Sequence, residues 1–138
     1  MTTDLEQLGR AVKAAQYRQH RTLETALLAI GTTVVQWDAL RAIARAPGAS
    51  AHDLAQATFQ TDQSFGTLAN RLEAQGLIER QPGEGRRIAH RLTPAGIGML
   101  GEGNAIAARV REALFAPLGE TDRRALQKIL TRLQAAEQ

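Results

Sequence analysis

The stretch TDQSFGTLANRLEAQGLIER, residues 61–80, holds the pattern from which the rest of the chain can be interpreted. At about 100° per residue, its apolar side chains fall within about 60° of one direction. These inward-facing residues are Phe65, Leu68, Ala69 and Leu72. The opposite face is neutral and rich in hydrogen-bonding groups, and it consists of Gln63, Thr67, Asn70 and Ala74, with Ser64 and Arg71 on its shoulders. The stretch therefore predicts an amphipathic helix over 61–75, capped by Thr61 and ended by Gly76.

A shorter helix and a hairpin flank this amphipathic helix. Ser50 and Asp53 resemble a capping box, which predicts a helix over 51–57 and a turn over 58–60. After Gly76, the segments 77–81 and 86–92 are short enough for two strands. Between them, residues 82–85 (Pro-Gly-Glu-Gly) have the composition of a turn. Together these elements predict a helix-turn-helix with a hairpin appended to it.

The distribution of charge says more about partners than the total charge does. Lys and Arg outnumber Asp and Glu by 17 to 14, so the net charge is only +3. Within residues 80–91, however, the arginines Arg80, Arg86, Arg87 and Arg91 stand against Glu84 alone. A solvated basic turn would give the same count. A neutral polar helix face suits base edges in a DNA major groove, so helix and hairpin together favour duplex DNA as the partner.

Further helices are predicted on both sides of this unit. Helical periodicity extends over 4–30, 34–46 and 94–116, and Thr121 can cap a last helix. The outer helices carry apolar stripes beyond a small central core, and a second copy of the chain is the simplest cover for them.

We therefore expect a mainly α-helical (α+β) fold in a single domain. Its parts are a winged helix-turn-helix over 34–93 and dimerisation helices over 1–30 and 94–138, all within one domain over 1–138.

Length and composition exclude several other classes of protein. The 138 residues are 43% hydrophobic and 22% charged, which is typical of one globular domain. No apolar run approaches the ~20 residues that span a bilayer, and MTTDLEQLGR at the start lacks the pattern of a secretory signal. The absence of cysteine excludes disulfides and thiolate chemistry and favours a cytoplasmic location, away from any membrane.

No catalytic or cofactor-binding set emerges. His20, His52 and His90 are too scattered for a metal site, and there is no nucleophile elbow or paired-carboxylate motif. The segment GIGMLG (96–101) matches a dinucleotide fingerprint, but Thr93-Pro94 starts a helix before its first glycine. The glycines then lie inside a helix, where close helix packing or a bend is the better interpretation. We expect no enzyme, cofactor or metal.

Several segments carry a resemblance to a known family. They are WDALRAIARAPGAS (37–50), LANRLEAQGLIER (68–80), EGRR (84–87) and RLTPAG (91–96). Together they resemble the MarR-type winged-helix regulators. In that family a homodimer places one recognition helix per subunit in successive major grooves, the wing inserts an arginine into the minor groove, and a small molecule or oxidant commonly relieves binding.

The resemblance implies that 61–75 is the recognition helix and that Arg86 is the wing arginine, held by Glu84. Asp62 and Gly66 depart from the family pattern, because basic or hydroxyl residues often fill these places. An acid at Asp62 favours the helix dipole but repels a nearby phosphate. The wing is therefore expected to supply most of the phosphate affinity.

These considerations define two sets of candidate site residues. For contacts to base edges and nearby backbone we predict Gln63, Ser64, Thr67, Asn70 and Arg71. We predict Arg86 in the minor groove and Arg87 and Arg91 on phosphates, with His90 able to touch a phosphate when protonated.

A cleft between the dimerising and DNA-binding parts is expected to bind a small aromatic or phenolic effector. Tyr17, His20, Trp37 and Arg41 could supply its aromatic walls and a counter-charge. The simpler interpretation of Trp37 is a core residue.

The function predicted from the sequence is a ligand-responsive transcriptional repressor that binds a palindromic operator as a homodimer. The alternative is a winged-helix protein–protein interaction module that has lost DNA binding, an alternative motivated by Asp62, Gly66 and the low net charge.

Overall fold

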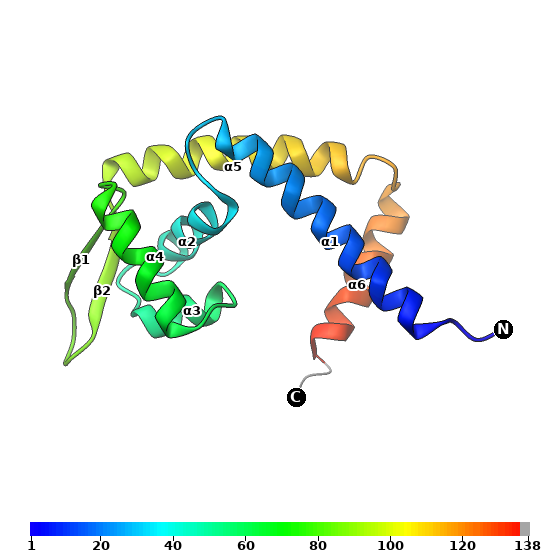
Figure 1. Ribbon diagram of the computed structural model, residues 1–138, viewed down its shortest axis with the longest axis horizontal. Coiled ribbons are helices and arrows are strands. Elements are labelled where there is room, and N and C mark those ends of the chain that lie inside the picture. Colours follow the sequence, from blue (N-terminus) through cyan, green and yellow to red (C-terminus); the bar gives the residue numbers. More distant parts are fainter. Residues whose placement is uncertain (136–138) are drawn as a thin grey trace.

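The computed structural model describes residues 1–135, which form six α-helices and one two-stranded antiparallel sheet. In chain order the elements are α1 (Leu5–Leu28), α2 (Val34–Arg45), α3 (Ala51–Ala57), α4 (Asp62–Ala74), β1 (Ile78–Pro82), β2 (Ile88–Leu92), α5 (Pro94–Leu114) and α6 (Glu120–Ala135). Figure 1 shows α5 as a long bridge, with α2, α3, α4 and the sheet at one end and α6 at the other. α1 packs along α5. The mainly α-helical class, with a helix-turn-helix followed by a hairpin, is confirmed.

Hydroxyl side chains determine where four of the helices begin. Each accepts a hydrogen bond from the backbone N–H three residues ahead, and they are Thr33, Ser50, Thr61 and Thr93. The predicted cap at Thr121 is wrong, because α6 already begins at Glu120. The carbonyl of Gly119 accepts the first helical hydrogen bond, from the N–H of Arg123 at 3.0 Å.

The buried side chains form two clusters. In the first, Phe65, Ala69 and Leu72 of α4 are fully buried against α2, α3 and β1, which confirms the inward face predicted for this helix. The second joins α1, α2 and α5 and consists of Leu23, Leu27, Trp37 and Ala107. The first cluster sets the orientation of α4, and the second attaches the helix-turn-helix to the outer helices.

The hairpin is shifted by one or two residues from its predicted position. β1 and β2 pair with Ile78 opposite Leu92 and Pro82 opposite Ile88. Arg86 and Arg87 were predicted at the start of the second strand, but they lie in the loop before it. The N–H of Gly83 donates to the carbonyl of Arg87 at 2.8 Å, and this bond closes the loop.

The glycine motif over 96–101 lies inside α5, as predicted. A Cβ atom at Gly96 would overlap the carbonyl oxygen of Leu77, so close packing explains this glycine. Within residues 1–135, no helix is both long and apolar enough to cross a membrane.

The outermost helical segments leave apolar side chains uncovered. α6 buries none of its residues, and Ile129 and Leu133 are more than half exposed. The N-terminal half of α1 is similar, with Leu5 77% exposed. They lie in the segments predicted as dimerisation helices, a role that stays a prediction.

Candidate nucleic-acid interface

The outer face of α4 is polar and open to solvent. Every residue predicted to contact bases or nearby backbone is exposed, namely Gln63, Ser64, Thr67, Asn70 and Arg71. A shallow hollow of about 410 Å³ runs along one side of this face, between Thr61 and Arg71. Ser64 donates to the side-chain oxygen of Gln60 at 3.2 Å, and Thr67 donates to the carbonyl of Gln63 at 3.1 Å. The hydroxyls are thus oriented by their own helix and its preceding turn.

Asn70 is the one member of this set with a partner on another element. Its side-chain oxygen accepts from Arg80 of β1 at 2.8 Å, and Arg80 also pairs with Glu73 at 2.7 Å. The hydrogen bond from Arg80 lowers the pKa of Glu73, against a smaller opposing effect of desolvation. The amide nitrogen of Asn70 can still donate outward.

The acid at the start of α4 also has a partner. Nδ1 of His52, on α3, lies 3.0 Å from both carboxylate oxygens of Asp62. His52 therefore belongs to this surface, although its scattered position in the sequence gave no sign of it.

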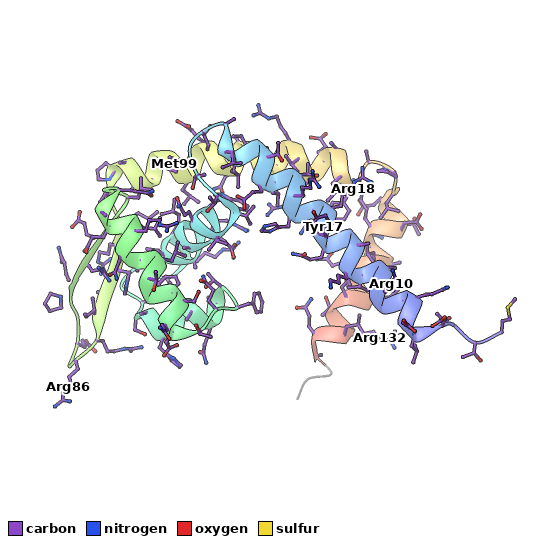
Figure 2. The ribbon with its side chains drawn as sticks, viewed as in Figure 1. Arg10, Tyr17, Arg18, Arg86, Met99 and Arg132 are labelled. Carbon is purple, nitrogen blue, oxygen red and sulfur yellow. The ribbon has the colours of Figure 1, made fainter. Side chains whose placement is uncertain are left out.

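The two arginines of the loop between β1 and β2 point to different partners. Figure 2 shows Arg86 at the far tip of the hairpin, reaching away from the body of the protein. Arg87 instead donates to Asp53 at 2.6 Å and to the hydroxyl of Ser50 at 3.4 Å. Among the described residues no ion pair joins Glu84 to Arg86, so the pairing implied by the resemblance is wrong for this conformation.

The capping box at α3 is only half formed. The hydroxyl of Ser50 accepts from the N–H of Asp53 at 3.2 Å, as predicted. The carboxylate of Asp53, however, binds Arg87. Asp is one methylene shorter than the Glu usual at this place, and the nearby guanidinium offers its carboxylate a stronger, charge-assisted bond.

His90 and Arg91 follow on β2 and have opposite environments. His90 is 1% exposed, and its Nδ1 lies 2.9 Å from the carbonyl of Ala49, so the predicted phosphate contact is wrong. Its ring packs edge-on against Phe65, with 6.1 Å between ring centres. Arg91 is exposed and lies opposite Glu79 in the strand register, and among the described residues no ion pair joins the two.

Trp37 is a core residue covered by two guanidinium groups. The ring is 2% exposed, and its Nε1 donates to Asn104 at 3.0 Å. The guanidinium carbons of Arg41 and Arg111 lie 4.5 and 5.2 Å from the ring centre. Desolvation lowers the pKa of Arg41, and the charges of the neighbouring arginines lower it further.

These arginines border a hollow of about 280 Å³ between α2 and α5. Its lining residues are Arg41, Ala44, Arg45, Leu100, Asn104 and Arg111. Of the four predicted effector residues, only Arg41 lines it, and Trp37 lies beneath the arginines. Tyr17 and His20 are on α1, where Tyr17 accepts from Arg21 at 3.4 Å and His20 lies 3.6 Å from Glu24. Sequence reasoning missed Arg45, Asn104 and Arg111, because helical spacing cannot reveal which arginines of separate helices converge.

Comparisons with known proteins agree with this geometry. The MarR family model matches residues 30–88, which include the helix-turn-helix and most of the hairpin. The HTH-type transcriptional repressor Rv2887 of Mycobacterium tuberculosis is 29% identical over 113 residues, covering 78% of this chain and 81% of the repressor. Residues 30–88 of the chain are therefore similar to the MarR family. The curated relatives that the chain matches are named HTH-type transcriptional repressors.

Solved structures of MarR-family proteins and other regulators share the fold of most of the chain. A probable transcriptional regulator from Pseudomonas aeruginosa superimposes with a TM-score of 0.81 at 28% identity, over 91% of this chain and 96% of that one. A mutant MarR from E. coli complexed with operator DNA gives 0.86 at 19% identity, over 91% and 92%. Rv2887 complexed with salicylic acid gives 0.73 at 24%, over 91% and 95%. At the identities of these last two, the likeness concerns the fold.

Proposed function

We propose that this protein is a ligand-responsive transcriptional repressor that binds a palindromic operator as a homodimer. The observation that supports this most is the exposed polar face of α4 beside a hairpin that presents Arg86 at its tip. A helix of this kind reads base edges while basic side chains bind phosphates. The E. coli relative complexed with operator DNA has the same fold. We expect the protein to act on cytoplasmic DNA and to have no catalytic activity.

The homodimer is supported by the uncovered stripes of α1 and α6. Isologous packing of two copies would cover them and place two copies of α4 on one side of the assembly. Two recognition helices related by a two-fold axis require half-sites about one helical turn, roughly 10 base pairs, apart.

Each exposed residue of the surface has a proposed role. Base edges and adjacent backbone are contacted by Gln63, Ser64, Thr67, Asn70 and Arg71. Arg86 enters the minor groove, where its charge is attracted by the phosphates on both sides. Arg91, on the outer side of β2, binds a phosphate.

Selection of bound sequences from random DNA, followed by gel shifts over a salt series, tests this function. We expect a palindromic consensus and a steep salt dependence. Arg86→Ala should weaken binding to every sequence and reduce the salt slope by about one, whereas Gln63→Ala should alter preference at one operator position. Unchanged affinity and slope for Arg86→Ala would show that the wing assignment is wrong.

The protein–protein module is the rival, and Asp62 remains its motivation. The contact with His52 weakens this motivation, since a ring nitrogen of His52 lies 3.0 Å from the carboxylate of Asp62 and gives the acid a partner within the chain. The same gel shift separates the two functions. No shift at low salt, with DNA flanking its own gene and with selected DNA, would favour the rival.

An anionic aromatic acid fits the hollow between α2 and α5 as effector. Arg41, Arg45 and Arg111 provide the positive charge, and Asn104 provides a hydrogen-bonding amide. The relative Rv2887 is known in complex with salicylic acid, so salicylate is a suitable probe. We expect calorimetry to detect its binding and Arg111→Gln to weaken it about tenfold, since a buried or half-buried charged hydrogen bond contributes about 1.5–3 kcal/mol. Arg109→Gln, on the same helix but outside the hollow, should bind salicylate normally.

A further inference from the structure

Arg87 ties the tip of the hairpin to the first turn of α3. Its Nη2 lies 2.6 Å from a carboxylate oxygen of Asp53 and 3.4 Å from the hydroxyl of Ser50. That hydroxyl also caps α3 by accepting from the N–H of Asp53. One guanidinium therefore reaches both the N-cap residue and an acidic residue in the first turn of α3, the first helix of the helix-turn-helix.

The backbone of Arg87 also determines the shape of the loop. Its carbonyl accepts from the N–H of Gly83 at 2.8 Å, and its own N–H donates to the carbonyl of Glu84 at 3.2 Å. Gly85, between them, has a φ of 63°, in the left-handed region that glycine adopts without strain. The residue that closes the loop is thus the residue anchored to α3, while its neighbour Arg86 is left to extend from the tip.

We propose that Arg87 is a positioning residue that braces the hairpin against α3 through Asp53, so that Arg86 is held ready for DNA. The DNA part of this statement rests on the proposed function. The brace itself is a property of the free protein.

The sequence suggested that Arg87 binds a phosphate. The chemistry of its contacts favours a brace instead. Asp53 would repel a phosphate at the start of α3 unless it is neutralised, and Arg87 neutralises it. If Arg87 left Asp53 to bind a phosphate, it would gain one ionic partner and lose another, and the acid would be exposed to the duplex. An ion pair at the surface contributes little to global stability. We therefore expect the ion pair between Arg87 and Asp53 to act by ordering the loop between β1 and β2 before DNA binds. A loop that is already ordered loses less conformational entropy on binding.

The absence of cysteine makes a direct test of this ordering practicable. Glu84→Cys introduces a single thiol for a spin label on the loop, and it leaves intact the backbone carbonyl of Glu84 that accepts from Arg87. In this background we expect Arg87→Ala and Asp53→Asn to raise the mobility of the label by similar amounts. Arg86→Ala is the matched control and should leave it unchanged. The exchanged pair Asp53→Arg/Arg87→Asp, which keeps the net charge, should restore the original mobility.

Operator binding by the unlabelled variants completes the test. We expect Arg87→Ala and Asp53→Asn each to weaken operator binding about threefold, with salt slopes near that of the unaltered protein, and the exchanged pair to recover most of the loss. Tighter binding by Asp53→Asn would contradict the brace, and a salt slope lower by about one in Arg87→Ala would show that Arg87 binds a phosphate.

The two readouts separate this inference from the proposed function. If no variant binds DNA while label mobility follows the expected order, the brace stands and the DNA-binding function fails. If Arg87→Ala and Asp53→Asn leave the label as ordered as Arg86→Ala does, the brace is overturned, whatever the protein does with DNA. Thermal unfolding of each variant confirms that the fold is intact when these comparisons are made.

Discussion

The helix-turn-helix with its hairpin and the outer helices differ in how they cover their apolar faces. In the helix-turn-helix, the inward side of α4 is fully buried by α2, α3 and β1, all from the same chain. α6 has the same kind of amphipathic pattern, with Leu126, Ile129, Leu130 and Leu133 at helical spacing, yet none of its residues is buried. The N-terminal half of α1 resembles α6 in this respect.

This difference shows what an amphipathic pattern establishes. It indicates that one face of a helix needs a cover, but it does not say whether that cover comes from the same chain. For α4 the cover is the chain's own core. α6 and the start of α1 find no such cover among residues 1–135, and under the proposed homodimer an isologous second copy would provide it.

The largest expected effect comes from placing a charge on an uncovered stripe. Leu133→Glu should convert the dimer into monomers at micromolar concentration, because an unpaired carboxylate in an apolar interface costs several kcal/mol. Sedimentation velocity measures the change. Ile97→Glu is the matched control, since Ile97 is 61% exposed on the part of α5 that lies beside the helix-turn-helix.

If Ile97→Glu dissociates the dimer and Leu133→Glu does not, the surfaces have been assigned the wrong way round. If the unaltered chain is already a monomer, the stripe of α6 is covered by something other than a second copy.

The sequence predicted the elements that depend on local patterns. The two faces of α4, the caps at Ser50 and Thr61 and the helical glycine motif all follow from spacing within one segment, and all are present. What it missed depends on pairs of residues far apart in the chain. The bond between Arg87 and Asp53 joins residues 34 positions apart, and the bond between Trp37 and Asn104 joins residues 67 apart.

His90 illustrates the same limit on a shorter scale. Its neighbours Arg87 and Arg91 are basic and exposed, so the local composition favoured a surface role. Its burial follows from which face of β2 lies against Phe65 of α4, and that is determined by the packing of the hairpin on the helix. The roles of the exposed site residues remain predictions, because exposure permits a DNA contact without requiring it.

A smaller effect on stability is expected at the start of α5, where Gly96 packs against the backbone of Leu77. Gly96→Ala should destabilise the fold by about 2 kcal/mol, because the new methyl group would overlap the carbonyl of Leu77 and backbone must shift to admit it. Gly98→Ala should stabilise the same helix by about 0.5–1 kcal/mol, since nothing lies within 4 Å of its Cβ position. Urea unfolding of both variants measures the difference.

The two substitutions should change the free energy of unfolding in opposite directions, although both positions lie on one helix two residues apart. The difference would show directly how a covered position differs from an uncovered one. Equal effects would mean that α5 does not pack against the start of β1 as the structure shows.

The smallest effect on stability is expected from the contact between Arg80 and Glu73, on the surface of the helix-turn-helix and its hairpin. The hydrogen bond from Arg80 lowers the pKa of Glu73, so the ionised carboxylate is favoured in the folded protein. A carboxyl group whose pKa is lower in the folded than in the unfolded state contributes stability at neutral pH. That contribution is lost as the pH falls through the folded pKa. Glu73→Gln should therefore lower the Tm slightly at pH 7, and the difference from the unaltered protein should shrink at pH 3. Glu102→Gln, an exposed glutamate of α5, controls for the loss of one negative charge. A Tm difference that stays constant between pH 7 and pH 3 would show that the contact between Arg80 and Glu73 does not depend on ionisation.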